Sequence, residues 1–147
     1  MKVFQCGCTR FALEGDGYRP LVMGILNITP DSFSDGGKYF SLSSALRHAE
    51  DMIADGVDII DIGAESSRPG SEPVPLQEEL DRVMPVIEAL KDCGKPLSID
   101  TYKPEVMAAA IAAGADMIND ICGFQSEASL KAVLDNSCGL CVMHMQG

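Results

Sequence analysis

Residues 27–40 read Asn-Ile-Thr-Pro-Asp-Ser-Phe-Ser-Asp-Gly-Gly-Lys-Tyr-Phe, and the interpretation of the whole chain starts from them. They follow an apolar run over 21–26, Leu-Val-Met-Gly-Ile-Leu, which is typical of a buried strand. A helical pattern begins near Ser41, directly after them. The polar loop therefore lies at the carboxyl end of a strand, which is the edge where parallel α/β folds bind ligands.

The same strand–helix order continues along the rest of the chain. Further buried strands are expected at 57–63, 97–100, 117–120 and 139–143. Helices are expected at 41–55, 75–92, 104–113 and 126–136. Each strand and helix together take about 30 to 40 residues, as in the units of a parallel sheet. Residues 1–18 predict a short β-hairpin that precedes these units and flanks the non-catalytic end of the sheet.

Two architectures fit this alternation. A doubly wound sheet would close within 147 residues, whereas a (β/α)8 TIM barrel typically needs about 250. Polar residues at successive strand ends favour the barrel, because only there do most strand ends converge on one centre; they are Asn27, Asp61, Asp100 and the pair Asn119-Asp120. We therefore predict an α/β fold consisting of the first four to five βα units of a TIM barrel.

Composition excludes several kinds of partner and compartment. The formal net charge is −11 and no basic stripe is present, which argues against nucleic acid. No apolar run is long enough to span a membrane, and the first residues lack the pattern of a signal peptide. We expect a cytoplasmic protein with its six cysteines as free thiols.

The spacing within two pairs of cysteines bears on metal binding. Cys6 and Cys8 are predicted to share one face of a strand, whereas the odd spacing of Cys138 and Cys141 sends them to opposite faces. Joint chelation by the second pair is therefore not expected.

Two motifs resemble one enzyme family. The run from Asn27 to Gly37 is similar to the first signature of dihydropteroate synthases, the folate-pathway enzymes that sulfonamide drugs inhibit. Asp61-Ile-Gly-Ala-Glu-Ser-Ser-Arg-Pro-Gly-Ser71 resembles the family's second loop, with Ser67 replacing the usual threonine. The resemblance covers residues 20–147 but only the first half of the family's length. It implies a pterin-binding domain over 1–147 that forms the N-terminal part of a TIM barrel.

The resemblance implies a transferase reaction. (7,8-Dihydropterin-6-yl)methyl diphosphate condenses with 4-aminobenzoate and gives 7,8-dihydropteroate and diphosphate, with Mg²⁺ present. Diphosphate leaves first, and the arylamine captures the resulting cation at the pterin methylene. By motif, Asn27 would bind Mg²⁺, while Ser67 and Arg68 would contact the anionic groups. Phe33 and Pro69 would help to assemble the 4-aminobenzoate pocket.

The pterin itself would be held by Asp100 and Asn119, with Asp61 close by. A pterin presents two adjacent N–H donors that a fixed carboxylate accepts, and its ring nitrogens suit the N–H groups of an asparagine amide. Spacing alone leaves an alternative open, in which Asp100 and Asn119 cap the helices that follow them.

Two other functions are alternatives to the synthase. A pterin-dependent methyltransferase barrel binds the pterin in the same way but transfers a methyl group to a cobalt cofactor. The loop that begins at Asp31 argues against this function. A non-catalytic half-barrel that binds pterin is the other. Residues of the family's second half contribute to its site, so we expect residues 1–147 alone to be inactive and prone to association. A homodimer is a further possibility for the full-length protein.

Overall fold

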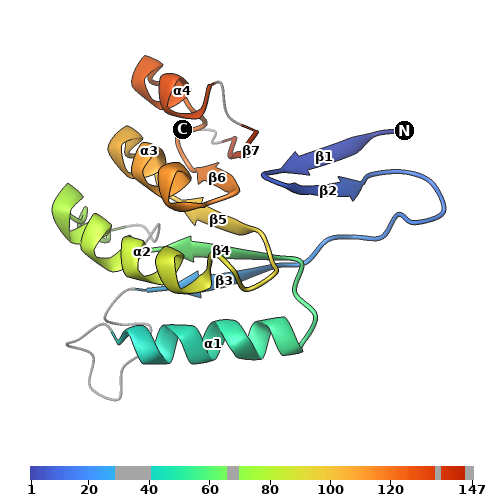
Figure 1. Ribbon diagram of the computed structural model, residues 1–147. Helices are drawn as coiled ribbons and strands as arrows, with labels where there is room; N and C mark the ends of the chain where they lie inside the picture. Colours follow the sequence, from blue (N-terminus) through green and yellow to red (C-terminus); the bar gives the residue numbers. More distant parts are fainter. Residues whose placement is uncertain (29–40, 66–69, 135–136, 145–147) are drawn as a thin grey trace.

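A computed structural model describes residues 1–28, 41–65, 70–134 and 137–144 (Figure 1). Its main sheet has five parallel strands in the order β3-β4-β5-β6-β7. They are β3 (Met23–Asn27), β4 (Ile59–Gly63), β5 (Leu97–Asp100), β6 (Met117–Asp120) and β7 (Gly139–Val142). Each strand pairs with the next strand along the chain, which is the strand order of a (β/α)8 barrel. The structure thus has the predicted architecture of part of such a barrel.

Four helices alternate with these strands in the described residues and lie along one face of the sheet (Figure 1). They are α1 (Leu42–Ala54), α2 (Leu76–Leu90), α3 (Pro104–Ala113) and α4 (Glu127–Val133). Helix α1 begins where predicted because the Ser41 side chain accepts the Ser44 N–H at 3.3 Å. Helix α3 ends at Gly114, whose φ of +114° suits a residue without a Cβ.

Several expected boundaries were wrong. Strand β3 starts at Met23 rather than at residue 21, and helix α2 ends at Leu90 rather than at residue 92. Helix α4 ends at Val133 and not at residue 136, because Leu134 already has an extended backbone. Strand β4 starts at Ile59, two residues later than expected, although Val57 and Asp58 before it are buried. None of the helices in the described ranges is long and apolar enough to cross a membrane.

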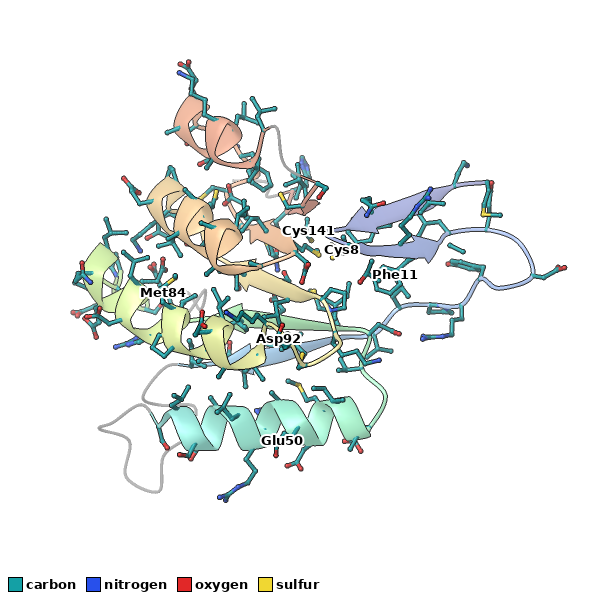
Figure 2. The ribbon with its side chains drawn as sticks, in the orientation of Figure 1. Cys8, Phe11, Glu50, Met84, Asp92 and Cys141 are labelled. Atoms are coloured by element: carbon teal, nitrogen blue, oxygen red, sulfur yellow. The ribbon has the colours of Figure 1, made fainter. Side chains whose placement is uncertain are left out.

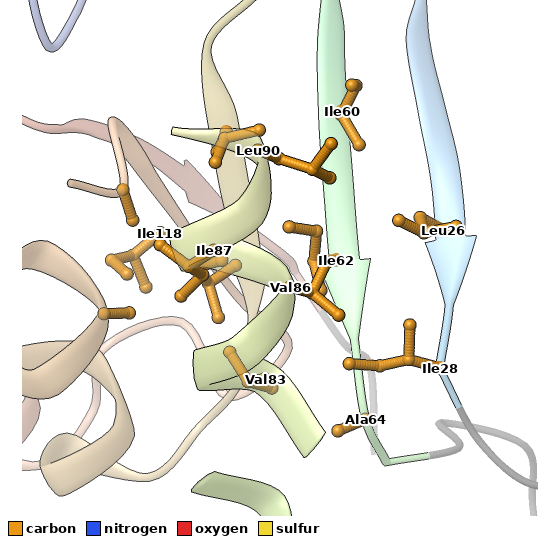
Figure 3. Packing of buried hydrophobic residues seen from close by; sticks show 14 of the residues in the cluster. Leu26, Ile28, Ile60, Ile62, Ala64, Val83, Val86, Ile87, Leu90 and Ile118 are labelled. Atoms are coloured by element: carbon orange, nitrogen blue, oxygen red, sulfur yellow. The ribbon is translucent and has the colours of Figure 1, made fainter. Parts of the chain in front are cut away.

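The larger hydrophobic core fills the space between the sheet and the helices (Figure 3). One residue from each of four neighbouring strands faces this layer, at the same level of the sheet; they are Leu26, Ile62, Ile99 and Ile118. Helix α2 contributes Val83, Val86 and Ile87, all of which are buried. This layer fixes which residues of each strand point to the other face, where the polar strand ends gather.

A β-hairpin, β1 (Val3–Cys6) and β2 (Thr9–Ala12), covers the amino ends of the strands (Figure 1). A second, smaller core of Cys6, Ile59 and Met117 forms there, with Phe4, Phe11, Met23 and Cys141 packed against it. A Cβ on Gly139 would lie 2.7 Å from Cζ of Phe4, so glycine is needed for this close approach. The predicted position of the hairpin, opposite the carboxyl ends of the strands, is confirmed.

The expectation for the first cysteine pair was wrong. Cys6 is buried at the end of β1, but Cys8 is exposed in the turn that Gly7 makes with a φ of +60° (Figure 2). The two side chains therefore do not share a strand face. All six cysteines are free thiols, as predicted.

Candidate active site

The carboxyl ends of the strands bring the predicted polar residues into one row. Asn27 is paired in register with Gly63, Gly63 with Asp100, and Asp100 with Asn119. Gly63 has no side chain, and a Cβ at this position would lie 3.5 Å from Oδ2 of Asp100 and 3.8 Å from Oδ1 of Asn27. No side chain therefore separates the Asp100 carboxylate from the Asn27 carboxamide at Gly63, and both groups contribute an oxygen near this position.

Asp61 lies on β4 two residues before Gly63, so it is on the same face of the sheet and one level below this row. It contacts the row through a hydrogen bond with Asn119. Its Oδ1 accepts a hydrogen bond from the Ser98 hydroxyl at 2.7 Å, and its Oδ2 accepts one from Nδ2 of Asn119 at 3.3 Å. Burial raises the pKa of Asp61, while both hydrogen bonds favour its ionised form. Asp61 therefore fixes the orientation of the Asn119 amide, and Ser98 is a site residue that the sequence analysis missed.

The pKa of the Asp100 carboxyl group is raised well above its usual range. Burial is the main cause that raises its pKa to about 7, and the charges of Asp61, Glu79, Asp120 and Glu65 add to it. Close to half of the molecules would carry a neutral Asp100 at neutral pH. A ligand with two adjacent N–H donors would favour the ionised form of Asp100, because the ionised carboxylate accepts both hydrogen bonds.

The helix-capping alternative for Asp100 and Asn119 is wrong. The N-cap residue of α3 is Lys103, which makes no side-chain capping bond, and the N-cap of α4 is Ser126. The residue that stabilises a turn here is Asp120, whose carboxylate accepts the backbone N–H groups of Cys122 at 2.8 Å and Phe124 at 2.9 Å. Asp100 and Asn119 thus cap neither helix, and the Asn119 amide instead contacts Asp61.

A compact charged cluster lies beside the row, which we call the Lys103 cluster. Its members are Glu65, Glu79, Thr101, Tyr102 and Lys103. The Lys103 ammonium lies 2.7 Å from Oε2 of Glu65 and 3.5 Å from Oε1 of Glu79. Sequence reasoning missed this cluster because its members come from a loop, a helix and a second loop that only the fold brings together.

Asn27 is the residue that the sequence predicts as a Mg²⁺ ligand, and it lies at one end of the row. Asn27 is exposed and offers one neutral oxygen. In the part of the chain that the structure describes, no group of three or more His, Cys, Asp or Glu side chains could hold a metal ion. Magnesium typically keeps several waters and is held by few protein ligands together with substrate phosphates. One carboxamide oxygen beside the row agrees with that type of binding.

Four predicted site residues lie outside the described residues: Phe33, Ser67, Arg68 and Pro69. Their roles stay predictions.

The predicted placement of Cys138 and Cys141 on opposite faces is confirmed. Cys138 packs against the larger core between the sheet and the helices, and Cys141 packs against the smaller core beside the hairpin. Cys141 also follows Asn119 in register, so its thiol lies in the same row as the polar strand ends.

Comparison with known proteins identifies the family. The family model described as "pterin binding enzyme" matches residues 23–147. A dihydropteroate synthase from Bacillus subtilis is 54% identical over 128 residues, which are 86% of this chain and 45% of that protein. The chain thus spans about half the length of the curated relatives it matches.

Solved structures give the same result. Burkholderia cenocepacia dihydropteroate synthase in complex with 7,8-dihydropteroate has a TM-score of 0.86 at 55% identity, covering 99% of this chain and 47% of that one. Xanthomonas albilineans dihydropteroate synthase with 4-aminobenzoic acid has a TM-score of 0.88 at 48% identity, covering 99% of this chain and 52% of that one. This similarity and the family match over residues 23–147 show that the chain belongs to the pterin binding enzymes.

Proposed function

We propose that the native gene product that contains this chain is a dihydropteroate synthase. It would join (7,8-dihydropterin-6-yl)methyl diphosphate to 4-aminobenzoate, giving 7,8-dihydropteroate and diphosphate. Residues 1–147 would act as the N-terminal part of its pterin-binding domain. The observation that carries the proposal is the row of Asp100 and Asn119 above the buried Asp61, at the strand ends where a barrel binds its substrate.

The groups of the row match the edge of a pterin ring. Asp100 would accept the ring N–H and the exocyclic amino group, and the amide of Asn119 would donate to a ring nitrogen. Asp61 would act through Asn119, whose amide it holds at 3.3 Å. A buried acceptor of this kind discriminates against rings without matching donors, because its polar atoms would then stay unpaired.

The reaction needs one bond to break and one to form. The carbon–oxygen bond to diphosphate breaks, the arylamine nitrogen bonds to the methylene carbon, and that nitrogen then loses a proton. Mg²⁺, when bound, would neutralise charge on the diphosphate, and Asn27 is the residue of this chain that would hold it. Ser67 and Arg68 would contact the anionic groups, and Phe33 and Pro69 would line the 4-aminobenzoate pocket.

The test is formation of 7,8-dihydropteroate by the native gene product from the two substrates, followed by chromatography. Asp100→Asn should lower kcat/KM on the order of 10- to 100-fold, since it removes a charge-assisted hydrogen bond. Asp92→Asn is the matched control, because Asp92 is exposed beyond the end of α2 (Figure 2). Pterin binding without product would favour the non-catalytic reading, and product formation unaffected by Asp100→Asn would contradict the assigned slot.

The same assay on residues 1–147 alone tests the prediction that this part is inactive.

We also propose a cytoplasmic location, which the six free thiols support. The homodimer stays a prediction.

A further inference from the structure

Thr101 lies where β5 leaves the sheet, and it is bonded to both residues that would hold the pterin. It follows Asp100 directly in the chain, and its backbone N–H donates to the Asn119 carbonyl at 3.1 Å. The residue is buried, with 3% of its surface exposed. A shift of Thr101 would therefore move Asp100 relative to Asn119, so the contacts that fix Thr101 also fix the spacing of these two side chains.

The Thr101 hydroxyl both donates and accepts a hydrogen bond. It donates to Oε2 of Glu79 at 2.9 Å, and its oxygen accepts the backbone N–H of Lys103, the N-cap residue of α3, at 3.2 Å. An ionised carboxylate has only acceptor sites, so the hydroxyl proton must point to Glu79, which leaves a lone pair for Lys103. The turn from β5 to α3 is thus held in one hydrogen-bonded arrangement.

Glu79 is a costly residue to bury at this position. Its side chain on α2 is only 1% exposed, and the Lys103 ammonium lies 3.5 Å from its Oε1. Burial is the main cause that raises the pKa of Glu79, while the Thr101 hydroxyl and the Lys103 ammonium favour its ionised form. A buried ion pair often adds little to stability, because the cost of desolvation offsets its attraction. Orientation of the neighbouring strand end is the use that its contacts support.

We propose that Glu79 and Thr101 are positioning residues for the pterin acceptor. They hold the end of β5 so that the Asp100 carboxylate meets the ring N–H and the exocyclic amino group together. Neither would touch the ring, because Thr101 follows Asp100 and points to the opposite, helix-covered face of the sheet. This inference rests on the proposed function. A misplaced carboxylate would keep one of the two hydrogen bonds more readily than both, so the pair should determine selectivity for rings that carry the amino group.

The test compares two ligands on the native gene product at pH 8, where Asp100 is mostly ionised. One ligand is 7,8-dihydropterin and the other is its analogue without the exocyclic amino group, and calorimetry gives both dissociation constants. The wild type should prefer the dihydropterin on the order of 10- to 100-fold, the worth of one charge-assisted hydrogen bond. Thr101→Val removes the hydroxyl but keeps the branched shape, and Glu79→Gln replaces the acceptor-only carboxylate. Each should lower the preference to about threefold, because the second hydrogen bond is then poorly aligned.

Thr101→Ser keeps the hydroxyl and should restore the preference to within about twofold of the wild type. Glu88→Gln is the matched control, because Glu88 lies on the same helix with 66% of its side chain exposed, and it should leave the preference unchanged. An unchanged preference in Thr101→Val or Glu79→Gln, or an equal loss of affinity for both ligands, would overturn the inference. If one of these variants does not fold, the other carries the same comparison with the same outcomes. A wild-type protein that does not bind the dihydropterin, or binds both ligands equally, would instead refute the proposed pterin slot.

Discussion

Pterin binding should release a proton from Asp100 at slightly acid pH. Burial and four neighbouring carboxylates raise the pKa of this residue to about 7, and the role of double acceptor that we propose for it requires the ionised form. At pH 6 about nine-tenths of the molecules carry the proton, so binding should release about 0.9 proton per pterin, falling to about 0.1 at pH 8. Affinity should fall about tenfold for each pH unit below 7, because binding must then expel the proton.

The assay is calorimetry with a dihydropterin that lacks the diphosphate, in two buffers of different ionisation enthalpy at each pH. The difference in apparent enthalpy gives the number of protons released. Asp100→Asn is the control and should abolish the release at pH 6. Asp61→Asn removes the strongest of the neighbouring charges, so it should lower the pKa of Asp100 and reduce the release. Release below about 0.3 proton at pH 6, or equal release by Asp100→Asn, would refute this account.

Three stability predictions follow from the packing, each measured by urea unfolding of the native gene product. Leu26→Ala empties a fully buried position between sheet and helices and should cost about 3 kcal/mol, whereas a cost below about 1 would contradict the described core. Gly139→Ala places a Cβ 2.7 Å from the ring of Phe4 and should cost about 2 kcal/mol; the Phe4→Ala background should relieve most of this, and an unchanged penalty there would place the clash elsewhere. Asp120→Ala removes the acceptor of two backbone N–H groups and should cost about 2 kcal/mol, with Asp120→Asn intermediate; equal stability of all three proteins would exclude this role.

The arrangement of the strands was predictable because it depends on local patterns. Short segments rich in Ile, Leu, Val and Met, most of them ending in Asn, Asp or Gly and alternating with helical repeats, indicated the parallel sheet, and Ser41 and Gly114 indicated helix ends. The row of Asn27, Asp100 and Asn119 followed from the same logic, since the carboxyl ends of parallel strands meet at one edge.

Features that depend on contacts between distant parts of the chain were not predictable in this way. Ser98 shares a face with Asp100, and this spacing of two was a usable signal, but its bond to Asp61 depends on the strand register. The contacts of Lys103 with Glu65 and Glu79 join positions 38 and 24 residues away, and no local pattern indicates them. The burial that raises the pKa of Asp100 likewise exists only in the folded protein.

The most direct test of the central claim is a crystal structure of the native gene product with a dihydropterin bound. The account predicts two adjacent ring donors within about 3.2 Å of the Asp100 carboxylate, and the Asn119 amide hydrogen-bonded to a ring nitrogen while it still contacts Asp61. A pterin bound away from the carboxyl ends of β5 and β6, with Asp100 making no contact to it, would contradict the account.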